Sequence, residues 1–391
     1  MINNKLIESI REYEEEAFLL NYDLADNPEL PSKEYRSSKK IQELLEKHNI
    51  KCEGNYCDLE TAFKGEVINK DAKYNIGILT EYDALPGVGH GCGHSASAAI
   101  SVLSALVLKG NENLINANVD IIGTPDEEDK GLKVPMVERG VFDKYDFVIM
   151  AHLGSKYSIP NWRLIAFETH EIEFIGKESH TAAAPWDGRS ALDGLMLSIH
   201  AIDMMRKMMR PGVIIEGIIQ EGGISPNIIP GKARAKYTFR STDASLLEKE
   251  IRPWLNNILK GCALATETTY KDKIFDYPFS DMNYNETGSE VIKSVMKENN
   301  IKFLDTPDAD GSSDIGNVSY RCPAFHPSIA ITDEWVPLHT SQMVDLVKSK
   351  KSEEAIVKGA TVILGFISKL LDNPEIINKM NEEFKESLKQ S

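Results

Sequence analysis

Three short apolar segments that alternate with helical segments constrain the fold of this chain more than any other feature. Residues 74–79, 119–123 and 147–151 have the length and the apolar character of buried strands, and helical patterns over 95–109 and 134–139 separate them. This alternation predicts an α/β fold with a parallel-rich sheet and helices on both of its faces. In such sheets the functional site lies beyond the carboxyl ends of the strands.

Residues suited to metal binding or proton transfer follow all three predicted strands. Asp83 and a glycine-rich loop with Cys92 and His94 follow the first strand. Three carboxylates at 126–128 follow the second strand, and His152 follows the third. A thiolate and an imidazole suit Zn²⁺, and one carboxylate can bind a cation while its neighbour takes a proton from a metal-bound water. Taken alone, the loop also fits a cysteine that only packs, and the acidic run fits a solvated face; their recurrence at strand ends favours a metal site.

A second domain is expected because 391 residues are too many for one compact core. From about residue 168 the pattern changes to strand-helix-strand-strand-helix-strand, the order of a small ferredoxin-like α+β sandwich with an antiparallel sheet. The alternating strand and helix pattern returns after about residue 280. We therefore expect a catalytic domain made of residues 1–167 and 281–391, with residues 168–280 inserted as a separate domain.

Composition and charge exclude several classes of partner. The net charge of −16, from 60 acidic and 44 basic residues, argues against a nucleic-acid or anionic-membrane surface, because both need a basic patch. No apolar run approaches membrane-span length, and the N-terminus lacks the apolar core of a signal peptide. Five cysteines without a repeating spacing indicate a reducing compartment. We expect a cytoplasmic protein that acts on a small molecule.

The motifs of the chain resemble those of the aminoacylase and dipeptidase family of dinuclear zinc peptidases, peptidase family M20. The likeness is greatest to its amidohydrolase branch, which contains indole-acetyl-amino-acid hydrolases, p-aminobenzoyl-glutamate hydrolase subunits and β-alanyl-lysine dipeptidase. The motifs span residues 28 to 340 in family order. They are Glu81-Tyr-Asp-Ala-Leu-Pro, Gly89-His-Gly-Cys-Gly-His, Gly123-Thr-Pro-Asp-Glu-Glu, Ala151-His152, residues 176–185, Gly222-Gly-Ile-Ser-Pro-Asn-Ile-Ile-Pro, Gly311-Ser-Ser-Asp and Pro337-Leu-His.

The resemblance implies a site for two divalent transition-metal ions, with zinc expected first and manganese or cobalt as alternatives. Cys92 would bridge the two ions. Glu127 would be the general base and acid, which activates the metal-bound water against an amide carbonyl and then protonates the leaving amine. Asp83 and His90 would orient the ligands without binding metal. The implied ligands are Cys92, His94, Glu128, His152 and His339.

The inserted segment resembles the lid and dimerisation domain of the family, so a homodimer through residues 168–280 is expected. His180 would stabilise the oxyanion at the scissile carbonyl, in some members within the partner subunit's site. Asn227 and Arg240 match residues that hold the substrate's backbone carboxylate, for which an arginine fork is well shaped. Gly311 and Ser312 also match substrate-binding positions.

Two segments depart from the family pattern. Ser95 and Ser97 stand where relatives carry Asn, Asp or a second His. The outer contacts that orient the metal ligands can therefore differ from those in relatives. Asp129-Lys-Gly replaces a longer glycine run, which can change the pocket wall and the acyl-group preference. Histidines without a motif are interpreted as surface or satisfied core residues, namely His48, His170, His200 and His326.

The predicted function is hydrolysis of the amide between an acyl or aminoacyl group and an amino acid with a free carboxylate. One alternative is a strict dipeptidase, for example for β-alanyl dipeptides, which requires an acidic group for the substrate's α-amine. A second is a hydrolase that uses Cys92 as its nucleophile, and a third is an inactive binding homologue. The cysteine mechanism leaves Glu127, Glu128 and His339 without a role, and scaffolding requires no set of five ligands.

Overall fold

The computed structural model describes residues 2–305 and 308–389 of the chain, which form two compact units. The first unit consists of Met1–Arg163, Met282–Ala309 and Ser313–Ser391, and the second of Leu164–Asp281 with Asp310–Ser312. Each unit has its own hydrophobic core. The second unit is thus inserted in the sequence of the first, and each is described by itself.

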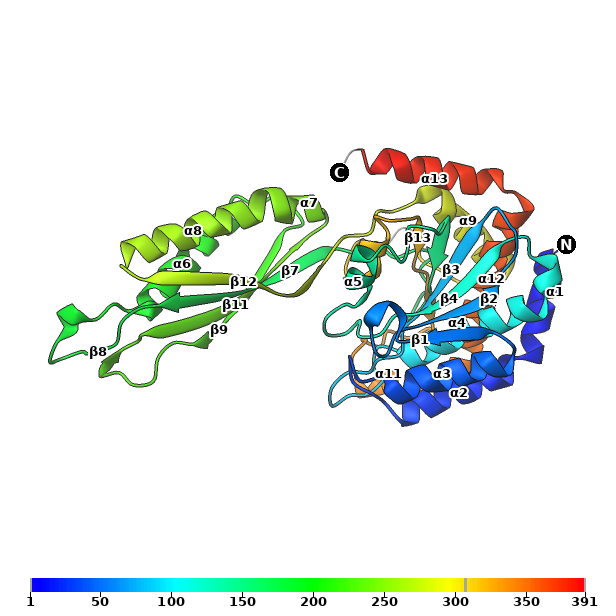
Figure 1. Ribbon diagram of the computed structural model, residues 1–391, viewed down its shortest axis with the longest axis horizontal. Coiled ribbons are helices and arrows are strands. Elements are labelled where there is room, and N and C mark those ends of the chain that lie inside the picture. The colour runs from blue at the N-terminus through cyan, green and yellow to red at the C-terminus, as the bar shows by residue number, and fades with distance from the viewer. Residues whose placement is uncertain (1, 306–307, 390–391) are drawn as a thin grey trace. The chain divides into compact units, whose positions relative to one another are not determined.

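The centre of the first unit is a six-stranded sheet (Figure 1). Its strands in spatial order are β1 (Lys51–Gly54), β2 (Phe63–Ile68), β4 (Asn118–Gly123), β3 (Asn75–Thr80), β5 (Phe147–Ile149) and β13 (Ala324–Phe325). Strands β4, β3, β5 and β13 are parallel, whereas β1 and β2 pair antiparallel at one edge. The predicted α/β fold with a parallel-rich sheet is confirmed, and the antiparallel direction of the edge strands is a feature that the strand pattern did not indicate.

Beyond this sheet, β6 (His152–Gly154) and β14 (Ser328–Ala330) form a short parallel pair. The helices of the first unit are α1 (Ile2–Ser9), α2 (Glu14–Asp26), α3 (Tyr35–Lys47), α4 (His94–Gly110), α5 (Lys133–Glu138), α9 (Glu286–Glu298), α10 (Ile315–Val318), α11 (Ser341–Val347), α12 (Lys351–Asp372) and α13 (Glu375–Ser387).

Helix α4 is the buried helix of the first unit and packs against β2 and β3 as well as against α2 and α12. Small residues let the neighbouring helix approach closely: a Cβ on Gly359 of α12 would lie 2.5 Å from Cδ1 of Ile100. Gly93 caps the start of α4 with a φ of 90°, a left-handed conformation that favours glycine. This turn makes His94 the first residue of α4, next to the carboxyl end of β3.

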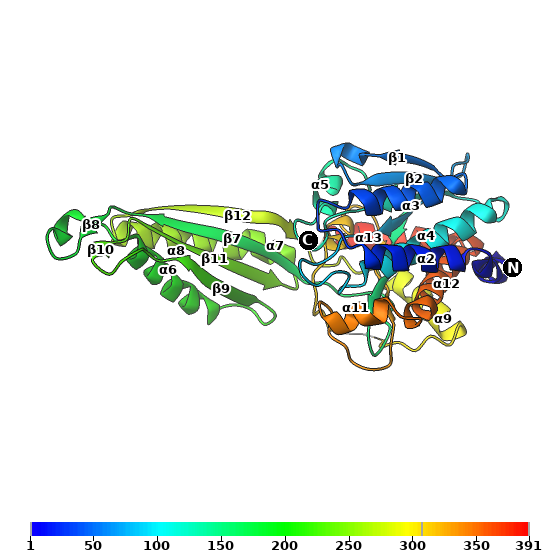
Figure 2. The ribbon, with the colours of Figure 1, turned by 90° about the horizontal axis from the view of Figure 1, so that it is seen from below.

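The second unit contains a four-stranded antiparallel sheet (Figure 2) with the order β12 (Thr269–Phe279), β7 (Ala166–Ile175), β11 (Lys232–Ser241) and β9 (Ile214–Glu221). Helices α6 (Ala191–Arg206) and α8 (Arg252–Ala265) pack against this sheet and each other, and α7 (Ala244–Leu246) precedes α8. Burial alternates along β7 and β11, as expected for strands with one face on a core. The predicted inserted α+β domain is confirmed.

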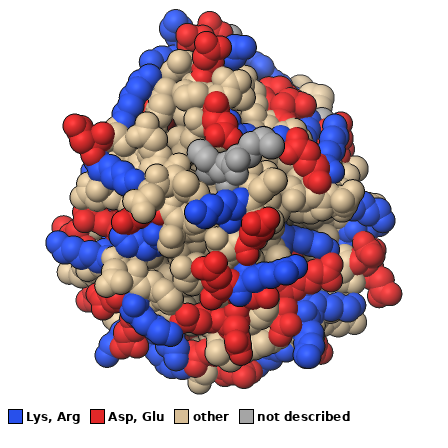
Figure 3. Space-filling model, turned by 90° about the vertical axis from the view of Figure 1, so that its right-hand side faces the viewer, with Lys and Arg blue, Asp and Glu red and all other residues tan. Residues whose placement is uncertain are grey.

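A short antiparallel pair extends the second unit, β8 (Ser179–His180) with β10 (Ile228–Ile229). Within the described residues, no helix combines the length and the apolar character needed to cross a membrane. On the face drawn in Figure 3, Lys and Arg side chains lie interspersed with Asp and Glu rather than gathered in one basic area. The expected absence of a nucleic-acid or membrane partner stays a prediction.

Candidate metal centre

Side chains that the sequence predicts as metal ligands lie together in the first unit, near the carboxyl ends of its parallel strands. Two groups of three ligand atoms share the thiol of Cys92, and the atoms of each group lie within 4.8 Å of one another. The groups are Cys92 with His94 and His152, and Cys92 with Glu128 and His339. The arrangement offers two adjacent cation positions with a common sulfur ligand.

Two distances within these groups match the spacing of ligands on one ion. Sγ of Cys92 lies 3.5 Å from Nε2 of His152. Oε2 of Glu128 lies 3.5 Å from Nε2 of His339. Ligand atoms on one tetrahedral zinc ion are about 3.3–3.6 Å apart, given metal–ligand bonds of about 2.0–2.3 Å. Each pair is therefore spaced to share an ion.

Hydrogen bonds turn both buried imidazoles toward the cation positions. Nδ1 of His94 lies 2.8 Å from Oδ1 of Asp83, and Nδ1 of His152 lies 2.6 Å from the carbonyl oxygen of Leu153. With Nδ1–H as the donor in each case, Nε2 presents a lone pair to the site. The second oxygen of Asp83 accepts the backbone N–H of Glu128 at 2.9 Å. Such outer contacts fix the tautomer and orientation of metal ligands.

Two buried polar atoms without hydrogen-bond partners show whether a cation fits between the predicted ligands. Nε2 of His94 and Oε1 of Glu128 are buried, lack a hydrogen-bond partner and lie 3.9 Å apart. Both atoms are acceptors in this arrangement, and buried acceptors without a partner are costly. A metal ion satisfies both, because it accepts lone pairs and supplies positive charge. The residues present therefore fit a divalent transition metal.

Glu127 lies beside the ligands and is the carboxylate suited to proton transfer. Its carboxylate belongs to a cluster with His94 and Glu128 whose ligand atoms lie within 4.8 Å of one another. Burial and the nearby carboxylates Glu81 and Glu128 raise the pKa of Glu127 well above its usual value. A carboxyl group with a raised pKa can take up a proton and release it again near neutral pH.

Two non-glycine residues of the site, Asp126 and the predicted ligand His339, have a left-handed backbone conformation. Asp126 has a φ of 59° and His339 a φ of 64°. The backbone N–H of Asp126 donates to the carboxylate of Glu34 at 2.9 Å, and the N–H of His339 donates to the carbonyl of Gly91 at 2.9 Å. These bonds hold turns that direct the following carboxylates and the His339 ring to the site.

A buried charge cluster that the sequence pattern did not indicate adjoins the site. The ammonium of Lys133, at the start of α5, donates to Glu81 and, at 2.6 Å, to Oδ1 of Asp314. All three residues are fully buried. Glu81 follows β3 directly, and the sequence motifs contain both Glu81 and Asp314, but they do not indicate that the two carboxylates share a lysine. Lys133 and Asp314 are 181 residues apart in the sequence, so their ion pair could not be predicted from the sequence pattern.

The sequence-based prediction for His326 is wrong. The absence of a motif predicts a surface or satisfied core residue, but His326 is buried, both ring nitrogens lack a hydrogen-bond partner, and its ring centre lies 5.6 Å from that of His152. Burial lowers its pKa to about 3, so the ring is neutral. His170, in contrast, is buried and bonded through both ring nitrogens to carboxylates. His90 is buried, and its role as an orienting residue stays a prediction.

The second unit brings together His180, the predicted oxyanion-stabilising residue, and Asn227, a predicted substrate-binding residue. Strand pairing places His180 opposite Ile228, and the N–H of Thr181 donates to the carbonyl of Asn227 at 3.1 Å. His180 is exposed, and its Nδ1 accepts the backbone N–H groups of residues 182 and 183, each at 3.2 Å. Its Nε2–H is therefore the ring's outward donor.

The remaining predicted substrate residues form a separate cluster in the second unit. Arg240 donates to Oγ of Ser312 at 3.4 Å and to the carboxylate of Glu216 at 3.2 Å. Ser312 in turn donates to the carbonyl of Ile165 at 2.8 Å, and the Ile165 N–H donates to the carbonyl of Gly311 at 2.8 Å. Arg240, Gly311 and Ser312 are thus neighbours, with the guanidinium partly exposed.

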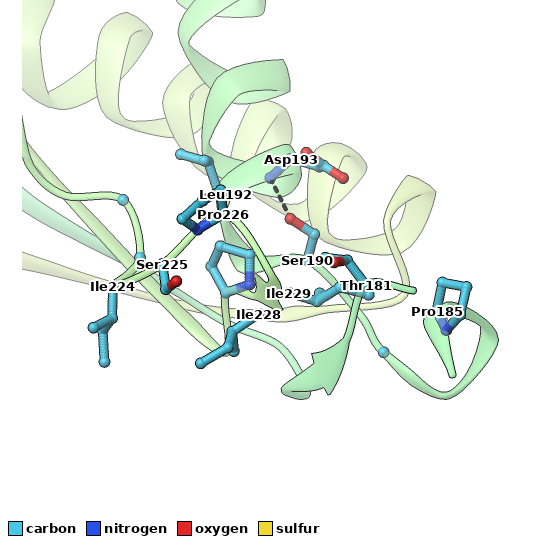
Figure 4. A pocket seen from close by; sticks show the side chains of 14 residues that line it. Thr181, Pro185, Ser190, Leu192, Asp193, Ile224, Ser225, Pro226, Ile228 and Ile229 are labelled. Carbon is cyan, nitrogen blue, oxygen red and sulfur yellow. Dashed lines mark hydrogen bonds between the residues drawn. The ribbon is translucent and has the colours of Figure 1, made fainter. Parts of the chain in front are cut away.

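A pocket of about 680 Å³ lies beside the β8–β10 pair (Figure 4). Apolar side chains such as Ile224 and Ile228 line it together with the polar Thr181, Ser190 and Asp193. The hydroxyl of Ser190 accepts the N–H of Asp193 at 3.2 Å and caps α6 there. Ile224 is 90% exposed, so an apolar side chain stands in solvent at the rim of this pocket.

Together, the α/β sheet, the paired cation positions and the adjacent Glu127 define the chain as a hydrolase that uses divalent metal.

Comparisons with known proteins agree with this class. The model of the peptidase dimerisation domain of family M20 matches residues 168–261. The Xaa-Arg dipeptidase of Mus musculus is 29% identical over 98% of this chain and 92% of its own length. A p-aminobenzoyl-glutamate hydrolase chain of Escherichia coli is 28% identical over 67% of this chain and 58% of its own length.

Solved structures share the fold. A dinuclear metal binding peptidase of the M20 family from Bacillus subtilis matches with a TM-score of 0.72 at 18% identity, over 93% of this chain and 99% of that one. An aminobenzoyl-glutamate utilization protein from Klebsiella pneumoniae matches with a TM-score of 0.71 at 16% identity, over 92% of this chain and 98% of that one. The chain is thus similar to M20 peptidases and amidohydrolases in its dimerisation-domain segment, along most of its length and in its fold.

Proposed function

We propose that the chain hydrolyses the amide bond between an acyl or aminoacyl group and an amino acid with a free carboxylate, using two zinc ions. Amide hydrolysis with divalent metal is the activity that the similarity to dipeptidases and amidohydrolases supports. The observation that carries the proposal is the pair of ligand groups that share Cys92, with Glu127 beside them.

The ligand set assigns roles to the chain's own residues. Metal ions held by the two Cys92 groups would polarise the amide carbonyl and lower the pKa of bound water. Glu127 accepts a proton from the attacking water on its carboxylate and delivers it to the nitrogen of the leaving amine. Asp83 keeps His94 oriented through its 2.8 Å contact. In this scheme His180 donates a hydrogen bond to the oxyanion, and Asn227 and Arg240 bind the substrate carboxylate.

A nucleophilic role for Cys92 is disfavoured by its surroundings. Burial and the neighbouring Glu128 raise the pKa of the Cys92 thiol well above its usual value. Free thiolate, the nucleophilic form, is therefore scarce without a metal. A bound cation would stabilise the thiolate, which fits a role as ligand.

A strict dipeptidase is the second candidate. The Xaa-Arg dipeptidases of Mus musculus and Homo sapiens align with 98% of this chain and 92% of their own length. This coverage favours a dipeptide whose C-terminal residue is basic over a larger acyl substrate. The two candidates share one mechanism and differ in the group on the amino side of the scissile bond and in the preference for a basic C-terminal residue.

We also propose a homodimer formed through the second unit. The family model that matches this unit describes a dimerisation domain. Its edge strand β9 exposes Ile214, Ile218 and Ile219 by 45%, 65% and 49%, and an exposed apolar edge strand is suited to pairing with another chain. Ile218→Asp should lower the mass measured by light scattering to that of one chain. Zinc as the physiological metal and a cytoplasmic location stay predictions.

The test of the function is hydrolysis of a substrate panel before and after chelation. The panel contains dipeptides with C-terminal Arg or Lys, β-alanyl dipeptides and N-acyl amino acids, each with a matched analogue whose carboxylate is amidated. We expect hydrolysis that chelator abolishes, zinc restores and amidation of the carboxylate weakens. Hydrolysis that survives chelation but is lost on thiol alkylation would contradict the proposal and favour the Cys92 nucleophile.

A further inference from the structure

Glu34, at the start of helix α3, is a fully buried carboxylate that the proposed mechanism does not use. Three hydrogen-bond donors converge on its two oxygens. Oε1 accepts the backbone N–H groups of Ser32 at 3.0 Å and of Asp126 at 2.9 Å. Oε2 accepts the hydroxyl of Thr61 at 2.9 Å. Both oxygens thus act as acceptors, and the side chain holds two segments that are distant from it in the sequence.

Asp126 is held at each of its polar groups. Its φ of 59° lies in the left-handed region, which costs conformational energy for a residue other than glycine. Its N–H is bound by Glu34, and its carboxylate accepts the hydroxyl of Ser32 and, at 2.9 Å, the N–H of Lys130. Its carbonyl accepts the N–H of Gly131 at 2.8 Å. A backbone conformation of this kind persists where the surrounding contacts impose it.

Glu127 lies between two residues whose backbone is anchored. The N–H of Asp126, before it, is bound by Glu34, and the N–H of Glu128, after it, is bound by Asp83 at 2.9 Å. Both accepting carboxylates are buried. The chain on each side of Glu127 is therefore fixed by a buried carboxylate, and the direction in which Glu127 leaves the backbone depends on the turn at Asp126.

We propose that Glu34 is a positioning residue for the general base. It holds Asp126 in the left-handed conformation and so directs Glu127 to its place beside His94 and Glu128. This inference rests on the proposed function, which assigns the base to Glu127. It gives a role in turnover to the connection between α2 and α3, which contributes none of the predicted ligands. The role requires a hydrogen-bond acceptor at residue 34, because the groups bound there are N–H and hydroxyl donors.

The test is a double-mutant cycle between residues 34 and 126, with kcat and KM for an amide substrate as the readout and every variant loaded with zinc. Glu34→Ala should lower kcat about 10–100-fold with little change in KM, the usual effect of losing an outer contact at a metal site. Glycine adopts the left-handed conformation without strain. In the Asp126→Gly background the same Glu34→Ala change should therefore lower kcat no more than a few-fold. A role in stability alone predicts the same factor in both backgrounds.

Glu34→Gln tests the kind of contact. Gln keeps an acceptor oxygen for the two N–H groups, so its kcat should stay within a few-fold of the wild-type value. The matched control is Glu29→Ala. The carboxylate of Glu29 also accepts two backbone N–H groups, at 3.1 and 2.6 Å, from the first turn of α3, but it has no hydrogen bond to Asp126. Its removal should leave kcat unchanged.

Urea unfolding of each variant shows whether it is folded under the conditions of the assay. If Glu34→Ala does not fold, Thr61→Val takes its place in the cycle. This substitution removes the hydroxyl that donates to Oε2 of Glu34 and so loosens the same carboxylate. Its loss of kcat should be smaller and should likewise disappear in the Asp126→Gly background.

The outcomes separate the inference from the proposed function. If wild-type protein hydrolyses its substrate and Glu34→Ala keeps the wild-type kcat, or loses the same factor in both backgrounds, the positioning role is refuted and the function stands. If zinc-loaded wild-type protein hydrolyses no amide, the proposed function is refuted, and the role of Glu34 in positioning its base is refuted with it. A loss of kcat that Asp126→Gly suppresses, with an unchanged control, supports the inference.

Discussion

Nδ1 of His94 lies 2.8 Å from Oδ1 of Asp83, and neither side chain is exposed to solvent. The contact determines which nitrogen of the ring is free, because the proton on Nδ1 is committed to the carboxylate. Oδ2 of the same carboxylate accepts the backbone N–H of Glu128 at 2.9 Å. One carboxylate thus contacts predicted ligands at two different strand ends, His94 after β3 and Glu128 after β4.

Asp83→Asn should weaken zinc binding about 10–100-fold, because the amide removes the charge that orients and polarises the His94 ring. Competition with a chromophoric chelator measures the change. Asp146→Asn is the control, since Asp146 also accepts a backbone N–H, that of Asn75, at 2.8 Å but has no contact with a ligand. Equal affinities for Asp83→Asn and the wild type would show that this contact does not support the site.

Glu127→Gln should lower amide hydrolysis about 10²–10⁴-fold while the content of bound metal stays at the wild-type level. The amide cannot take a proton from water, yet it leaves the ligands in place. Parallel measurements of turnover and of metal per chain check this, with the exposed neighbour Asp129→Asn as control. Normal turnover in Glu127→Gln would remove Glu127 from the role of base.

Stability should depend on pH through His170 in the second unit. Burial disfavours its charged form, but Asp272 at 2.8 Å and Glu168 at 3.0 Å overcome this and raise its pKa to about 9. Because the folded pKa lies above the unfolded value of about 6.5, the contribution is full below that pH and is lost as pH rises through about 9.

Comparison with His170→Gln isolates this contribution from other titrating groups. Urea unfolding of the wild type and the variant should show a difference of order 2–3 kcal/mol at pH 6 that shrinks toward pH 10. A difference that stays constant over this range would mean that the histidine is not charged in the folded protein.

Gly359→Ala should destabilise the first unit by about 1–3 kcal/mol, because the new Cβ would lie 2.5 Å from Cδ1 of Ile100 in α4. In an unobstructed helix the same change stabilises by up to about 1 kcal/mol. Gly261→Ala in α8 is the matched control, since nothing lies within 4 Å of the Cβ there. Thermal unfolding of both variants should therefore give shifts of opposite sign, and stabilisation by Gly359→Ala would contradict the close packing of α12 on α4.

The sequence predicts what local spacing encodes. Apolar strands with polar residues at their ends, such as Asp83 after β3 and Glu128 after β4, identify the α/β sheet and the side of it that carries the site. The cluster of Lys133 and Asp314 was not predictable, because it joins α5 to a residue 181 positions away. The prediction for His326 is wrong for the same reason: its neighbour His152 is remote in sequence, and no motif surrounds it.

The central claim is that Cys92 is a ligand shared by two metal positions. The direct measurement is the number of zinc ions bound per chain in the wild-type protein and in Cys92→Ala. Both proteins are loaded with zinc in the same way, and free metal is then removed. We predict two ions in the wild type and a loss of metal from both positions in Cys92→Ala, because each ligand group contains this sulfur. Two firmly bound ions in Cys92→Ala, or none in the wild type, would contradict the account.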